Sequence, residues 1–135
     1  MKKITGIGGV FVKCKDVDVM KQWYKTYLGL DAGDYGMTFE WCDLSKLAVS
    51  GSTTWNLFSK DTKHFDPSTQ NFMINYTVEN IEELFEELKT SGVTILDTIQ
   101  SYDYGKFVHI LDIEGNKIEL WEPPNKQSQT FKNNN

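Results

Sequence analysis

Two residues near the C-terminal end, His109 and Glu119, have the types and the spacing of an acid–base pair. They flank Ile113-Glu114-Gly115, and a three-residue loop with glycine in the left-handed position commonly connects two antiparallel strands. In that register the two side chains lie opposite each other, with Cβ atoms about 5 Å apart. The carboxylate then favours the imidazolium and raises the pKa of His109. Such a pair could bind an anionic group or transfer a proton, or Glu119 could simply orient a buried histidine.

Aromatic residues on the neighbouring strands suit a flat or cationic ligand. Alternation along the strands predicts that one face of the sheet covers the helices, and that the other is a concave, partly wet surface. Trp55 is predicted to face the helices, whereas alternation around Glu40 leaves the direction of Trp41 open. The candidate ligand-binding residues are Phe11, Trp41, Asn56, Phe58, Asn75, Tyr104, Phe107 and Trp121.

Two halves of the chain repeat one order of elements, and these elements must position the candidate residues. Each half opens with a strand, at 10–14 and at 74–78, followed by Asp16 or Asn80 as a helix N-cap. Apolar residues then recur at helical spacing, and each helix ends at a glycine. In the first helix they are Met20, Trp23, Tyr24, Tyr27 and Leu28. Further strands are predicted at 37–42, 53–59, 94–100, 106–111 and 117–122.

This pattern predicts an α+β fold in which two β-α-β-β-β modules form a curved mixed sheet around a concave pocket, with the helices on the outer face. One domain is expected over residues 1–124. The first module spans about 4–60, a linker 61–70 and the second module about 71–124, before a polar tail at 125–135.

Composition argues against several classes of partner. The net charge is −5, whereas nucleic-acid binding needs a basic surface. No apolar run approaches the roughly 20 residues of a membrane span, and no apolar stretch follows Lys2 and Lys3 as in a signal peptide. Cys14 and Cys42 have no CxxC spacing, so we expect free thiols and a cytoplasmic location.

Three segments in this order resemble the vicinal oxygen chelate superfamily, which contains glyoxalase I, bleomycin-resistance proteins and extradiol dioxygenases. Residues 10–29 resemble its strand-Asp-helix-aromatic opening, and residues 74–92 resemble the repeat of that opening. Residues 111–120 are similar to its closing motif Asp-Pro-Asp-Gly-Asn-x-Ile-Glu-Leu, with Ile113 in place of proline. The resemblance covers about residues 4–124.

The resemblance implies that a catalytic metal takes its ligands from the first and last strands of each module. Those positions fall on Gly9, Asn56, Met73 and Glu119. Only Glu119 offers a suitable donor. The two histidines of the chain are His109 and His64, and His64 lies in the linker. We therefore expect no cofactor, with a divalent metal as the alternative.

The residues are compatible with two functions. The first is a glyoxalase- or bleomycin-resistance-like protein that binds a small aromatic or cationic molecule in an aromatic-lined cup without a catalytic metal. The alternative is a metal-dependent lyase or dioxygenase that uses Glu119 and His109. The identity of the ligand, and whether the chain is an enzyme, stay open. The resemblance also implies a homodimer, with a small molecule as the other partner and neither nucleic acid nor membrane.

Overall fold

The structure of the protein is a computed structural model that describes residues 3–43, 45 and 48–124. The predicted tail at 125–135 lies outside these residues. In chain order the elements are β1 (Ile4–Cys14), α1 (Val17–Leu28), β2 (Met37–Asp43), β3 (Ala48–Ser59), β4 (Phe72–Val78), α2 (Ile81–Thr90), β5 (Gln100–Tyr102), β6 (Gly105–Leu111) and β7 (Lys117–Glu122). Within the described part, no helix has the length and apolar character needed to cross a membrane.

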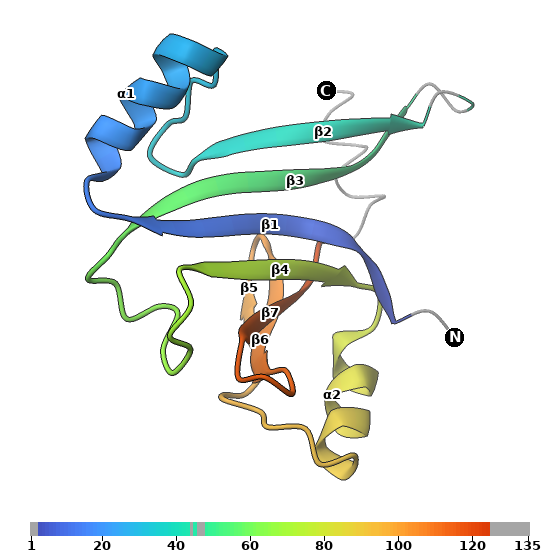
Figure 1. The fold of residues 1–135 in the computed structure, drawn as a ribbon. Coiled ribbons are helices and arrows are strands. Elements are labelled where there is room, and N and C mark those ends of the chain that lie inside the picture. The colour runs from blue at the N-terminus through green and yellow to red at the C-terminus, as the bar shows by residue number, and fades with distance from the viewer. Residues whose placement is uncertain (1–2, 44, 46–47, 125–135) are drawn as a thin grey trace.

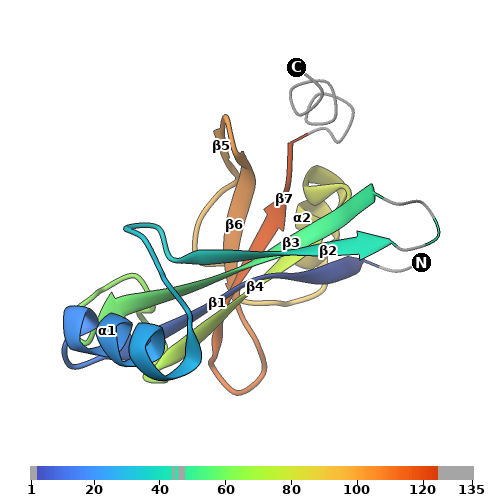
Figure 2. The same cartoon turned by 90° about the horizontal axis from the view of Figure 1, so that it is seen from above.

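One mixed sheet contains all seven of these strands, in the order β2-β3-β1-β4-β7-β6-β5. The two modules join where β1 pairs antiparallel with β4, and within the modules β1 pairs in parallel with β3 and β4 with β7. The sheet is twisted and open, so that β6 and β7 run steeply across the direction of β2 and β3 in Figure 2. The helices lie towards opposite ends of the molecule (Figure 1). The predicted α+β architecture is confirmed.

The two modules differ in their strands, because the first contributes β1 to β3 and the second β4 to β7. The strand predicted at 94–100 is largely wrong, since β5 begins only at Gln100. Before that point the chain runs beside β6, where the Leu96 N–H donates to the His109 carbonyl at 2.9 Å. The Asp97 side chain then accepts from the His109 N–H at 2.8 Å. A carboxylate thus takes the place of a backbone acceptor, and the ladder is interrupted.

The main core lies between the second module and α2. It consists of Val78, Ile81, Leu84, Val108, Ile110 and Leu120. The segment that precedes β5 adds partly buried side chains to it, among them Val93, Ile95 and Ile99. Asn80 caps the start of α2 by accepting from the Glu83 N–H at 3.2 Å, and its amide donates back to the Glu83 carboxylate. The two residues thus form a capping box, and Asn80 is the N-cap that the sequence predicts.

Helix α1 is much less covered than α2. Asp16 caps its start, and Gly29 ends it in a left-handed conformation, as predicted. Tyr24 packs on Trp55 with ring centroids 4.7 Å apart, which confirms that Trp55 faces this helix. However, no residue of α1 is buried, and Trp23, one of the apolar residues at helical spacing, is 50% exposed.

Candidate functional site

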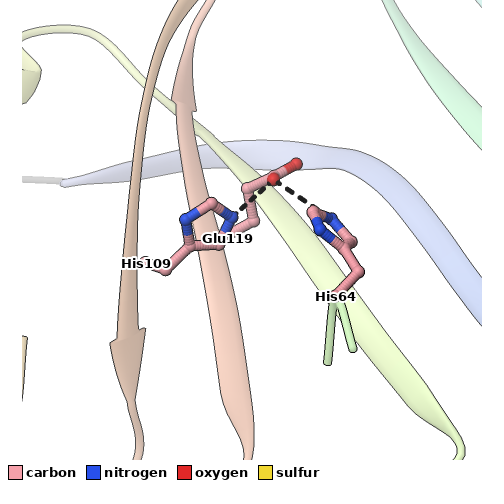
Figure 3. Close-up of side chains that lie close together, drawn as sticks. All are labelled: His64, His109 and Glu119. Atoms are coloured by element: carbon pink, nitrogen blue, oxygen red, sulfur yellow. Dashed lines mark hydrogen bonds and ion pairs between the residues drawn. The ribbon is translucent and has the colours of Figure 1, made fainter. Parts of the chain in front are cut away.

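The β6–β7 hairpin sets His109 directly opposite Glu119, as predicted. The Asp112 N–H donates to the Asn116 carbonyl at 3.0 Å, which closes a loop of three residues, and Gly115 has the expected positive φ of 83°. Alternate residues of both strands enter the α2 core, so His109 and Glu119 point to the other face. Their Nε2 and Oε2 atoms are 2.7 Å apart (Figure 3).

His109 and Glu119 each have a second hydrogen-bond partner, which contacts the other polar atom of the side chain. Asp97 Oδ2 lies 2.7 Å from His109 Nδ1. Asn75, the neighbour of Glu119 across the β4–β7 pairing, donates its amide to Glu119 Oε1 at 2.6 Å. Asn75, His109 and Glu119 are all buried. His109 Nε2 and Glu119 Oε2 are therefore the atoms left to face a common point.

His64 reaches the same point from the segment between β3 and β4. Its Nε2 is 3.9 Å from Glu119 Oε2, on the far side of that carboxylate from His109 (Figure 3). Its ring stacks on Phe58 with centroids 5.4 Å apart and planes 10° apart. Sequence reasoning assigned His64 to a linker and so missed it. The available signal was Phe65, a large apolar residue in a polar stretch, which is fully buried.

The charges of the group follow from burial and these hydrogen bonds. Burial lowers the pKa of His109, but its hydrogen bonds to Glu119 and Asp97 prevail, so this pKa is raised as predicted. Burial raises the pKa of Glu119, but the hydrogen bond from His109 contributes to a net lowering. Burial lowers the pKa of His64 despite the nearby Glu119 carboxylate. These shifts favour the ionised form of Glu119, the protonated form of His109 and the neutral form of His64.

The donor atoms of His64, His109 and Glu119 all lie within 4.8 Å of one another. A tetrahedral zinc ion with bonds of about 2.1 Å holds its donors about 3.4 Å apart. The 2.7 Å and 3.9 Å separations in this group bracket that value. The contacts from Asp97 and Asn75 are of the kind that orient metal ligands. The residues fit a divalent cation, which would take the place of the proton on His109 Nε2.

Aromatic rings flank the polar group on two sides. On the His64 side, Phe11 meets Phe58 with centroids 5.6 Å apart. On the other side, Phe107 and Trp121 stack with centroids 6.0 Å apart, and the Trp121 indole donates to the Tyr104 carbonyl at 2.8 Å. Four of the predicted aromatic residues, with the Tyr104 backbone, therefore lie around the predicted acid–base pair.

Glycines in β1 make room for these neighbours. A Cβ atom at Gly8 would collide with Asn75 Oδ1 and would lie 2.8 Å from Trp121 Cε3. Two other predicted site residues make contacts in other parts of the sheet. The Trp41 ring rests over Gly51, its cross-strand partner, and close to Gly6. Asn56 uses its side-chain oxygen locally, accepting from the Leu57 N–H at 2.9 Å.

Comparison with known proteins gives one family and one fold. The profile of the Glyoxalase/Bleomycin resistance protein/Dioxygenase superfamily matches residues 6–120. No curated protein sequence matches the chain.

Solved structures of the same fold include methylmalonyl-CoA epimerase from Mycobacterium tuberculosis, at 21% identity and a TM-score of 0.63 over 96% of this chain and 95% of that one. A variant of the Streptomyces coelicolor methylmalonyl-CoA epimerase, in complex with 2-nitronate-propionyl-CoA, has 15% identity and a TM-score of 0.65 over 90% and 99%. A superfamily member from Vibrio splendidus 12B01 has 13% identity and a TM-score of 0.54 over 86% and 97%. At these identities the likeness shows the fold alone.

Proposed function

The chain belongs to the Glyoxalase/Bleomycin resistance protein/Dioxygenase superfamily, and we propose that it is a metal-dependent enzyme holding a divalent ion with His64, His109 and Glu119. The convergence of these three donor atoms is the observation that carries the proposal. Two imidazole nitrogens and one carboxylate oxygen suit Zn²⁺ and Fe²⁺, and they leave positions open for a substrate.

The proposed ligands occupy different places from those that the resemblance implies. Gly9 and Met73 have no imidazole or carboxylate group to bind a metal, and the side-chain oxygen of Asn56 accepts a hydrogen bond from the N–H of the next residue. Glu119 is the one shared position. His109 comes from the strand beside Glu119, and His64 comes from the connection between the modules. This different origin of the ligands is why the sequence alone favoured a site without metal.

The surrounding residues support chemistry on a small organic molecule. A divalent ion held by His64, His109 and Glu119 would supply Lewis-acid chemistry, either towards a substrate oxygen or by lowering the pKa of a bound water. Asp97 fixes the orientation of the His109 ring, and Asn75 holds the carboxylate of Glu119. The rings of Phe58 and Trp121 make the surroundings of the polar group apolar on two sides, which suits an organic substrate.

Metal binding by the purified protein tests this proposal. Protein prepared without chelators is expected to contain close to one equivalent of Zn or Fe. After chelation, calorimetric titration with Zn²⁺ should show one site. His64→Ala, His109→Ala and Glu119→Ala should each weaken that site at least tenfold, whereas Glu114→Gln, on the exposed hairpin loop, should not. A wild-type chain that binds neither Zn²⁺ nor Fe²⁺ below millimolar concentration contradicts the proposal.

A second candidate function is binding of a small aromatic or cationic molecule without a metal. It is favoured by His109, whose two ring nitrogens each meet a carboxylate at 2.7 Å, so the group is already neutralised in part without any ion. A thermal-shift screen of such molecules against the chelated protein tests it, because a ligand that binds the native state raises the melting temperature. Stabilisation by an organic molecule together with indifference to metals would favour this function over the first.

A cytoplasmic location also remains a proposal. It is supported by Cys14 and Cys42, which are both free thiols and so are consistent with a reducing compartment. Alkylation of Cys42, the exposed thiol, in intact cells before lysis would test it. Rapid labelling by a reagent that cannot cross the membrane would contradict a cytoplasmic location.

A further inference from the structure

The segment at 60–71, which carries His64, is fixed at both ends to β1. We call it the His64 segment. The Lys60 N–H donates to the Cys14 carbonyl at 2.9 Å, and the Lys13 N–H donates to the Asn71 carbonyl at 2.7 Å. The segment thus leaves the sheet and returns to it beside the same strand.

Phe65 anchors the middle of the His64 segment. Its side chain is fully buried beside Phe58, with ring centroids 5.3 Å apart. The Lys13 ammonium lies 5.2 Å from the centre of the Phe65 ring. These contacts fix the residue after His64, and the His64 N–H donates to Thr62 Oγ1 at 3.2 Å within the segment itself.

Lys117 adds a restraint on the His64 backbone from β7, the strand that carries Glu119. Its Nζ donates to the His64 carbonyl at 2.6 Å, although the two residues are 53 positions apart in the chain. Lys117 and Glu119 are alternate residues of β7, so their side chains leave the strand on the same face. One strand therefore carries both the carboxylate of the site and the donor that holds the backbone of its most exposed histidine. Charge-assisted hydrogen bonds of this kind are stronger than neutral ones.

We propose that Lys117 is a positioning residue that sets the distance between His64 and Glu119, and so determines whether His64 takes part in metal binding. This inference rests on the proposed metal site. It assigns a role to a lysine that is not one of the three proposed metal ligands.

A double-mutant cycle with Zn²⁺ as the probe tests the inference on the full chain. Lys117→Met should weaken Zn²⁺ binding about tenfold or more, in the range expected for outer-shell residues. The double variant His64→Ala/Lys117→Met should bind no more weakly than His64→Ala alone, because both changes remove the same contribution. Lys117→Arg should restore most of the affinity. Lys63→Met, which removes a neighbouring positive charge from the same segment, should leave binding unchanged.

The metal-free protein provides an independent readout. The chain has only two histidines, so their ring signals are readily assigned by NMR. Lys117→Met should shift the His64 signal as the ring leaves its stack on Phe58, and should leave the His109 signal in place.

The outcomes separate the two proposals. If the wild-type chain binds no Zn²⁺, the proposed function fails. If wild type binds Zn²⁺ and Lys117→Met binds it equally well, only the positioning role fails. An additive loss in the double variant also rejects the role, because Lys117 would then act independently of His64. Where Lys117→Met lowers the melting temperature of the metal-free chain, lack of rescue by Lys117→Arg overturns the inference, and rescue supports it.

Discussion

The chemistry of His109 depends on which of its ring nitrogens is already held. The Asp97 carboxylate accepts one hydrogen bond from His109 Nδ1 and another from the backbone N–H of His109, so this one side chain orients the ring. This leaves Nε2 to face Glu119. A histidine held in this way is ready for metal binding or for proton transfer, but its orientation is lost if the carboxylate is replaced.

Asp97→Asn is therefore expected to weaken Zn²⁺ binding about 10- to 100-fold, as the loss of an outer-shell partner does in other sites. Calorimetric titration of the chelated protein measures the change. Asp103→Asn, in the exposed turn between β5 and β6, is the matched control and should bind like wild type. Equal affinities for Asp97→Asn and wild type would remove Asp97 from the site.

Gly8 is the second residue on which the site depends, because Asn75 and Trp121 both lie against it. Gly8→Ala should lower the free energy of unfolding by about 1–3 kcal/mol, since the added methyl group forces its neighbours to move. Urea denaturation measures the loss. Gly33→Ala, with nothing within 4 Å of the added atom, should have little effect. A Gly8→Ala protein as stable as wild type would show that Asn75 has room to shift.

Only some of the contacts around His109 could be predicted from the sequence. The pairing of His109 with Glu119 could be predicted, because alternation and a three-residue loop fix the register of a hairpin. Asp97 could not, since it acts from a segment that was expected to be a strand. His64 could not either, because its place depends on how the irregular segment between two strands folds back.

Among the elements, the β6–β7 hairpin bears most directly on the site, and Asp112 stabilises its turn. The Asp112 carboxylate accepts from the backbone N–H groups of Glu114 and Asn116 and from the Asn116 amide, each at 2.9 Å. The hydrogen bond from the Asn116 side chain is the largest cause of the lowered pKa of Asp112, and the backbone bonds add to it. The ionised form is thus favoured in the folded state.

The lowered pKa of Asp112 determines how its contribution to stability changes with pH. Because the folded pKa is depressed, the stabilisation from Asp112 is present above the unfolded carboxyl pKa of about 3.9. It is lost as the pH falls through the folded value. Asp112→Asn should therefore be less stable than wild type at pH 7, and the difference should shrink in acid. Denaturant unfolding between pH 7 and pH 3 measures it, with Glu114→Gln in the same loop as control. A difference that stays constant with pH would contradict this role.

Most helices and strands could be predicted because short sequence patterns within each element indicate them. Examples are the N-caps Asp16 and Asn80, and the alternation of apolar and polar residues along β6 and β7. The extent of β5 was missed because the Asp97 side chain competes with the backbone for the His109 N–H, and strand propensity does not report such competition.

For the molecule as a whole, the two helices are unequally covered. The second module packs α2 over its sheet with the help of the segment before β5. The first module has no counterpart among the described residues, and α1 leaves large apolar side chains exposed. Trp23 is 50% exposed, Tyr27 69% and Leu28 64%. Large adjoining apolar side chains on a surface are typical of an interaction site.

We expect a second copy of the chain to cover this face of α1, in line with the homodimer that the family resemblance implies. Light scattering at micromolar concentration should then give twice the chain mass of 15.6 kDa. Trp23→Glu should shift the protein towards the monomer, because burying a charge at the interface is costly. The fold should persist, since Trp23 already meets solvent in the single chain.

Tyr35→Ser, at a turn residue that is 89% exposed, is the control and should remain a dimer. A monomeric wild-type mass would leave the α1 face without its proposed partner, and metal binding by that monomer would show that the site is complete within one chain.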